Sequence, residues 1–170
     1  MSIEAALDVA MIGEELRAKT HPFEIEAMPN FSGVSRRTMS IPGEGKHEIS
    51  LYIYEPTQKL EPSPCIVHLH GGAMVFFAAA DPQYVRLCST MASHGLTVVS
   101  VEFRNAGGKL GPFPFPYGLD DCCTAVKWIF ENKQELQLSK VIVSGESGGG
   151  NLSRAATRRA KSEGWRDSSE

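Results

Sequence analysis

The sequence contains no stretch approaching the roughly 20 consecutive apolar residues that a membrane-spanning helix needs. It is also short of net charge, because 17 Lys and Arg against 20 Asp and Glu leave −3 at pH 7. That balance gives no reason to expect a nucleic acid or an anionic membrane as partner. The opening residues, Met1-Ser2-Ile3-Glu4, lack the basic segment and apolar core of a secretory signal peptide. We therefore expect a soluble, globular, cytoplasmic protein with no membrane span.

Cysteine is scarce, and its spacing excludes the common zinc-binding patterns. The four cysteines are Cys65, Cys88, Cys122 and Cys123, and no pair has C-x-x-C spacing. Thiols scattered over expected strands and helices in a cytoplasmic protein are usually buried core residues rather than a disulfide framework. We expect four buried thiols, and neither a metal nor a cofactor.

What the sequence does contain is a serine between glycines at the end of an apolar run. Val141-Ile142-Val143 is typical of a buried strand, and a helical pattern follows Gly145-Glu146-Ser147-Gly148-Gly149. A serine at a tight strand-to-helix turn takes a strained backbone, and its neighbours two residues away must lack Cβ atoms. This G-x-S-x-G spacing is that of a nucleophile turn. A glycine-rich structural turn or a phosphate-binding loop are the alternatives.

A second motif lies about 75 residues upstream. His70-Gly71-Gly72-Ala73 follows the apolar run 65–69. Loops of the H-G-G-G type supply backbone N–H groups that stabilise an oxyanion, and glycine lets that backbone approach the substrate. Two such motifs in this order, each after an expected strand, favour an acyl-transfer site.

The chain resembles the hormone-sensitive-lipase-like (family IV) esterases of the α/β-hydrolase superfamily and looks closest to their brefeldin A esterase branch. The resemblance extends roughly from residue 35 to Trp165 and is carried by the segments His70–Met74, Val101–Ala106, Phe113–Cys122 and Gly145–Leu152. It implies hydrolysis of a small carboxylic ester, with Ser147 as the nucleophile. It also implies an oxyanion hole formed by Gly71, Gly72 and Gly148, with Ala73 in place of the usual third glycine.

Histidine is missing where the resemblance requires it. The family order is serine, then an acid, then histidine, but none of the five histidines follows Ser147. The chain is therefore expected to be the N-terminal half of such an esterase. Two alternatives remain: a non-catalytic binding remnant that keeps the pocket, and an acyl-transfer enzyme that recruits its base elsewhere.

Strands alternating with helices predict an α/β fold with a mostly parallel sheet and flanking helices, ending after the helix that follows Ser147. A cap-type helical segment is expected over 1–34 and the main domain over 35–170. The expected elements are a helix over 3–19, a hairpin of 35–41 with 47–55, strands at 65–70, 97–103 and 141–144, and helices over 82–94 and 119–136.

Three further expectations concern single sites. His70 is expected to orient the loop that follows it rather than to act as a base. Asp120 and Asp121 lie in the first turn of a helix and are expected to be structural. By the same resemblance, the strand at 141–144 lies in the middle of the sheet, and the strand that would pair with its second edge is expected after residue 170. That edge should therefore be unpaired and should favour self-association.

Overall fold

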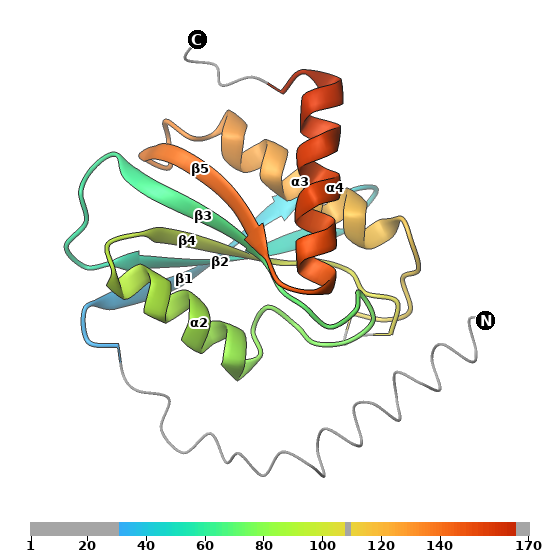
Figure 1. The fold of residues 1–170 in the computed structure, drawn as a ribbon, viewed down its shortest axis with the longest axis horizontal. Coiled ribbons are helices and arrows are strands. Elements are labelled where there is room, and N and C mark those ends of the chain that lie inside the picture. Colours follow the sequence, from blue (N-terminus) through green and yellow to red (C-terminus); the bar gives the residue numbers. More distant parts are fainter. Residues whose placement is uncertain (1–30, 108–109, 166–170) are drawn as a thin grey trace.

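The computed structural model describes residues 31–107 and 110–165 (Figure 1). The helix expected over 3–19 and most of the expected segment 1–34 lie outside this range. The elements, in chain order, are β1 Val34–Pro42, β2 Glu48–Pro56, β3 Ser63–Leu69, α2 Pro82–Ser93, β4 Thr97–Glu102, α3 Tyr117–Glu131, β5 Leu138–Gly145 and α4 Gly148–Glu163.

The five strands form one mixed sheet in the order β1-β2-β4-β3-β5. β2 is antiparallel to both β1 and β4, whereas β3 is parallel to β4 and to β5. Four strands therefore run in one direction and β2 alone runs in the other, as the expected mostly parallel sheet requires. The carboxyl ends of β3 and β5 lie side by side, with Leu69 paired to Gly145.

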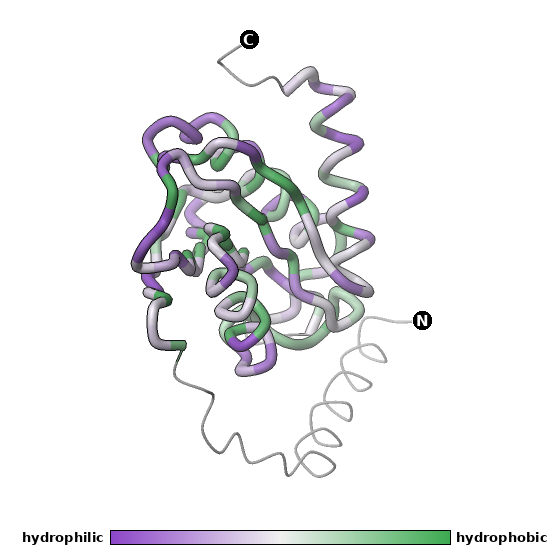
Figure 2. Tube along the Cα trace, turned by 60° about the vertical axis from the view of Figure 1, so that its left-hand side comes forward, coloured by the Kyte–Doolittle hydropathy of each residue, from purple (hydrophilic) through white to green (hydrophobic). Residues whose placement is uncertain are grey.

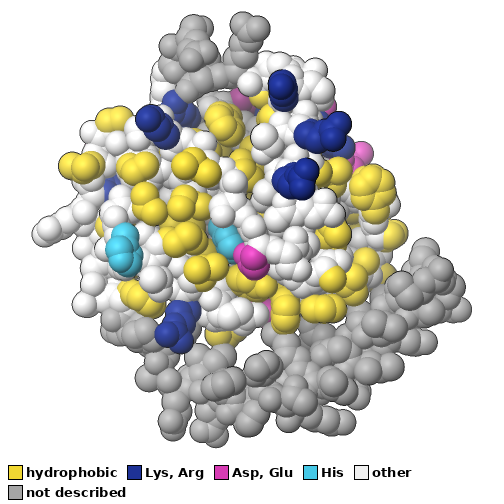
Figure 3. Space-filling model, in the orientation of Figure 1, with side chains coloured by type: hydrophobic (Ala, Val, Ile, Leu, Met, Phe, Trp, Pro, Cys, Tyr) yellow, Lys and Arg dark blue, Asp and Glu magenta, His cyan; other side chains and the backbone are white. Residues whose placement is uncertain are grey.

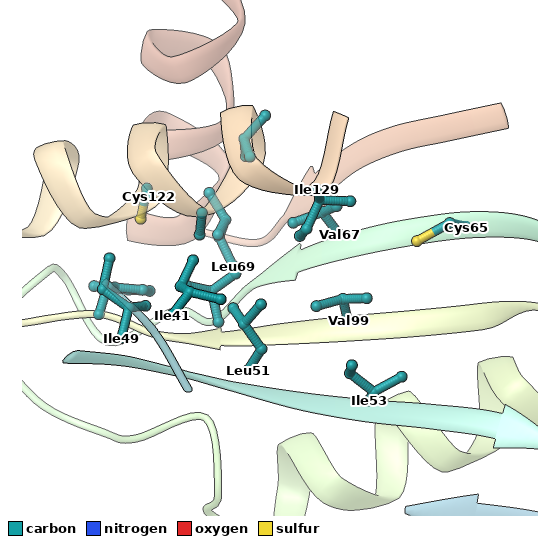
Figure 4. Close-up of a cluster of buried hydrophobic side chains, with 14 of the residues drawn as sticks. Ile41, Ile49, Leu51, Ile53, Cys65, Val67, Leu69, Val99, Cys122 and Ile129 are labelled. Atoms are coloured by element: carbon teal, nitrogen blue, oxygen red, sulfur yellow. The ribbon is translucent and has the colours of Figure 1, made fainter. Parts of the chain in front are cut away.

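Alternation along the strands divides the sheet into two faces. One face packs on α3 and α4 through the main core, where Figure 4 shows Val67, Leu69 and Val99 beneath α3. The opposite face packs on α2, where Cys88 and Ala92 meet Tyr54 and Val98. Each large aliphatic side chain buried in this way contributes roughly 1.5–3 kcal/mol to stability.

Helix α2 begins and ends close to its predicted limits. Pro82 occupies its first turn, and Gly95, just past its end, has a φ of 89°. Asp81 precedes the helix, but its carboxylate accepts the N–H of Ala78 and caps no helical amide. Asp81 was thus correctly predicted as the N-cap residue, but its side chain stabilises the loop before the helix through the Ala78 N–H.

The prediction for α3 was wrong at its ends, because the helix runs over 117–131 and not over 119–136. Residues 132–137 form turns, and Gln137 has a positive φ of 55°. Leu136 still packs against the core from this turn. The apolar spacing that predicted a longer helix thus reflects the burial of Leu136 and not a helical backbone at that residue.

β5 is the last strand of the sheet among the residues that the structure describes. On its α2-side face, Ile142 keeps 63% of its surface exposed. Figure 3 shows hydrophobic side chains gathered beside basic side chains that lie along α4. Figure 2 shows that hydrophilic residues recur along this helix. Over residues 31–107 and 110–165, no helix is long and apolar enough for a membrane span.

Candidate active site

Ser147 lies in the turn between β5 and α4, at the N-cap position of the helix. Its φ of 51° and ψ of −118° are unusual for a residue with a Cβ atom, and such a conformation costs about 1–3 kcal/mol. The residue is exposed, and its hydroxyl caps no amide of the helix. The turn therefore presents an exposed hydroxyl at the positive end of a helix dipole.

The glycines on either side of Ser147 are required by close backbone contacts. A Cβ atom on Gly149 would lie 2.0 Å from the carbonyl oxygen of Leu69, and one on Gly145 would lie 2.6 Å from the same atom. Both distances are below any real Cβ contact. We call residues 145–149 the serine turn, and its glycines let it pack directly on the end of β3.

Residues 70–77, here called the glycine loop, follow β3 and lie against the serine turn. Gly72 has a φ of 106°, and Val75 and Phe76 both donate their N–H groups to its carbonyl oxygen. Ala73 also has a positive φ, of 56°. A Cβ atom on Gly148 would lie 3.1 Å from the nitrogen of Ala73. The structure thus brings Gly72, Ala73, Gly148 and Ser147 together.

The loop after β4 ties down the far side of the glycine loop. Ala106 and Gly107 donate their N–H groups to the carbonyl oxygens of Met74 and Val75, and the Asn105 amide donates to Phe77 at 2.8 Å. The serine turn and the loop after β4 therefore both contact the glycine loop and stabilise its strained backbone.

Gly71 departs from the expected arrangement. Its N–H donates to Oε1 of Glu146 at 2.8 Å, so this amide already has a charged acceptor. The expectation that Gly71 contributes a donor to an oxyanion hole is set aside for that reason. The amides of Gly72, Ala73 and Gly148 are the candidate donors that remain.

His70 is completely buried, and its ring contacts two neighbouring aromatic side chains. Its Nδ1 lies 2.7 Å from the carbonyl oxygen of Gly71, to which it donates, and its ring stacks on Phe103 at 4.2 Å. Burial lowers the pKa of His70 to about 4, so the ring is neutral near pH 7. These contacts fit an orienting role in the glycine loop rather than that of a base.

A group of polar residues on the α2 side of the sheet was missed by the sequence analysis. Nε2 of His68 lies 3.5 Å from Oε2 of Glu146. Burial lowers the pKa of His68, and the Glu146 carboxylate opposes that shift. Period-two alternation from Ile142 through Ser144 to Glu146 was the only signal that placed Glu146 on this face.

Asp121 and Asp120 have structural partners. Asp121 is buried and accepts the backbone N–H, Nε and Nη2 of Arg104, the last at 2.7 Å. Asp120 pairs with Arg159 at 2.7 Å in a more exposed position. Both carboxylates thus have structural roles, as was predicted, but through arginine partners that the sequence did not indicate.

A shallow hollow of about 650 Å³ lies along α4. Its lining includes Asn151, Arg154 and Arg158. Among the described residues no group of three His, Cys, Asp or Glu side chains has an arrangement able to hold a metal ion. All four cysteines are buried and free.

The fold and the serine turn together define an α/β protein with a serine held at the carboxyl end of its sheet. A family model described as alpha/beta hydrolase fold matches residues 66–168. The chain therefore belongs to the α/β-hydrolase family.

Similarity to individual proteins points to esterases. Carboxylesterase NlhH of Mycobacterium tuberculosis is 30% identical over 149 residues, which cover 86% of this chain and 43% of that protein. The solved structure of brefeldin A esterase, a bacterial homologue of human hormone sensitive lipase, superposes with a TM-score of 0.86 at 34% identity. That match covers 96% of this chain and 45% of the esterase. The chain thus spans less than half the length of these relatives.

One relative has a different role in its name. The gibberellin receptor GID1 of Oryza sativa subsp. japonica is 36% identical over 110 residues, covering 61% of this chain and 30% of the receptor. The family resemblance therefore includes both esterases and a receptor.

Proposed function

We propose that this chain carries the nucleophile and the oxyanion-binding loop of a carboxylic ester hydrolase. The observation that carries the proposal is the backbone of Ser147, whose φ of 51° places an uncapped hydroxyl between the end of β5 and the start of α4. A strained serine of this kind, packed against a glycine-rich loop, is the arrangement that acyl transfer needs.

In the proposed reaction, Oγ of Ser147 loses its proton and attacks the ester carbonyl carbon. The ester C–O bond breaks, the alcohol leaves with that proton, and water then hydrolyses the acyl-serine and restores the hydroxyl. The N–H groups of Gly72, Ala73 and Gly148 are the proposed donors to the developing oxyanion. Removing one such donor typically costs about 10²–10³ in kcat. Gly71 is left out, because its N–H donates to Glu146.

The general base of this reaction is proposed to come from outside the described residues. His70 donates to Gly71 and His68 faces Glu146, so neither ring is arranged to take the serine proton. No histidine follows Ser147 in the sequence. Supporting this view, the esterase relatives are more than twice as long as the part that this chain matches.

Acetyl transfer tests the proposal directly. The purified chain is incubated with p-nitrophenyl acetate and digested, and the peptide containing Ser147 is analysed by mass spectrometry. We expect one acetyl group on Ser147, formed slowly because removal of triad members leaves a residual rate of only about 10³–10⁴ over water. The Ser147→Ala variant should lose this adduct. Equal release of p-nitrophenol by both proteins, with acetyl groups only on lysines, would contradict the assignment.

A second candidate function is ligand binding without hydrolysis. It is favoured by the similarity to a receptor. Saturable binding of an ester in calorimetry, with no acetyl transfer to Ser147, would select this alternative.

A further inference from the structure

The side chain of Glu146 connects the serine turn to the glycine loop. Glu146 immediately precedes Ser147, and its Oε1 accepts the N–H of Gly71, which is 75 positions away in the chain. The two segments meet because β3 and β5 are parallel neighbours, with Leu69 opposite Gly145. One hydrogen bond at 2.8 Å thus joins the two loops that leave this edge of the sheet.

The carboxylate also lies beside residues of two other elements. Oε2 lies 3.5 Å from Nε2 of His68 on β3. Tyr84, from α2, lies beside the carboxylate. Burial and then the nearby Glu146 raise the pKa of the Tyr84 hydroxyl, which therefore keeps its proton and can donate to Glu146. Although 47% of the Glu146 side chain is exposed, its carboxylate thus has a hydrogen bond to Gly71 and lies beside residues of β3 and α2.

Space around Gly71 is fitted to this carboxylate. A Cβ atom at Gly71 would lie 3.1 Å from Oε1 of Glu146 and 3.3 Å from the Tyr84 hydroxyl oxygen. The residues that follow, Ala73 and Met74, have φ values of 56° and 61°. Positive φ in residues with a Cβ atom persists only when neighbouring contacts hold the backbone, and the Gly71–Glu146 bond is one such contact.

We propose that Glu146 is the positioning residue of the glycine loop, which it holds so that the amides of Gly72 and Ala73 face Ser147. The part that concerns catalysis rests on the proposed esterase function. Glu146 does not touch the substrate in this scheme. It acts through Gly71, and its position next to Ser147 makes the serine turn and the loop move as one unit.

Amide hydrogen exchange measured by NMR on the full 170-residue chain tests the contact. The proteins compared are the wild type, Glu146→Ala and Glu146→Gln. A hydrogen bond to a charged group is lost in Glu146→Ala, so exchange at Gly71 should accelerate roughly 10–150-fold. Glu146→Gln keeps an acceptor oxygen and should restore most of the protection.

Two controls separate this effect from general unfolding. The amides of Val67 and Val99, in the paired strands β3 and β4, should exchange at unchanged rates in both variants. Glu131→Ala removes an exposed carboxylate from α3, and it should leave Gly71 exchange unchanged. Unchanged exchange at Gly71 in Glu146→Ala would overturn the proposal.

Acetyl transfer to Ser147 supplies the functional readout. Glu146→Ala should lower the limiting rate of transfer about tenfold or more without changing the ester concentration at half saturation, and Glu146→Gln should recover it. An unchanged limiting rate, despite faster Gly71 exchange, would make Glu146 merely structural and overturn the proposal. If the wild type transfers no acetyl group, the esterase function fails, and the exchange measurement alone decides whether Glu146 holds the loop.

Discussion

Ala73 has a backbone conformation that usually belongs to glycine, whereas its neighbour Gly72 has one that no other residue can adopt here. A Cβ atom on Gly72 would lie 2.0 Å from the carbonyl oxygen of Phe76. We expect Gly72→Ala to lower the free energy of unfolding by at least about 2 kcal/mol, because the loop must shift. Urea denaturation measures the change.

The matched variant is Ala73→Gly. Relief of positive-φ strain gains about 1–2 kcal/mol, and the extra freedom of glycine in the unfolded chain offsets about 0.5–1 kcal/mol of it. The free energy of unfolding should therefore rise by about 0–1.5 kcal/mol. A larger loss in Ala73→Gly than in Gly72→Ala would show that the loop conformation is wrong.

Burial of His70 makes stability depend on pH. Its folded-state pKa of about 4 lies below the ordinary value of 6.5, so the unfolded chain binds the proton more tightly. The stability that the neutral ring contributes is complete above pH 6.5 and is lost as the pH falls from 6.5 to about 4. The loss is on the order of 3 kcal/mol, because a tenfold difference in proton affinity corresponds to about 1.4 kcal/mol.

The variant His70→Asn separates this contribution from that of other groups. An asparagine side chain can still donate to the Gly71 carbonyl oxygen but does not titrate. Denaturant unfolding between about pH 4 and pH 7 should show a flatter pH dependence for His70→Asn than for the wild type. Identical slopes would mean that His70 is not the group responsible.

Residue patterns predicted the backbone of the serine turn. The strained conformation of Ser147 and the need for its flanking glycines were predicted because steric exclusion is a local rule, readable within a few residues. The bond from Gly71 to Glu146 was not predicted, because it depends on which strands are neighbours and on where a side chain points. No short pattern contains either fact.

At the scale of elements, α3 is held by two carboxylates in different surroundings. Asp121→Ala leaves the guanidinium of Arg104 buried without its partner, and we expect a loss of about 3–5 kcal/mol in the free energy of unfolding. Asp120→Ala breaks a partly exposed pair and should cost only about 0–1 kcal/mol. Thermal or urea unfolding compares them, and equal losses would argue against the buried pair as the anchor.

The first hairpin was predicted more accurately than α3 or β5, which begins at Leu138 rather than at the predicted residue 141. The hairpin of β1 and β2 lies within a residue of its predicted limits, because Ile49, Leu51 and Ile53 alternate and all face the core. Leu136 misled the prediction for α3, because a buried side chain in a turn can continue a helical spacing by coincidence. Periodicity reports which side chains are buried, and only the backbone decides how long a helix is.

At the scale of the whole molecule, β5 forms an edge of the sheet that the described residues build, and Ile142 is exposed on it. Such an edge is a template for another strand. We predict that the chain self-associates in a concentration-dependent way, as sedimentation velocity would show. Ile142→Lys should weaken association, since a charge on an edge strand opposes pairing.

Leu60→Lys is the control for that experiment. Leu60 is 82% exposed and lies in the loop between β2 and β3, outside any strand. Its replacement should leave association unchanged. A monodisperse monomer of the wild-type chain at all concentrations, with protected amides at 141–143, would refute the prediction.

The parallel pairing of β3 with β5 also has a kinetic consequence. The two strands that carry the glycine loop and the serine turn are separated by α2, β4 and α3, so this pairing closes a long stretch of chain. Contacts so distant in sequence are formed at a high entropic cost and slow folding. The β1–β2 hairpin is local and can form early. Ser147 and Gly72 therefore meet only when β3 pairs with β5, later than the local hairpin, and the same step completes the main core that these two strands share.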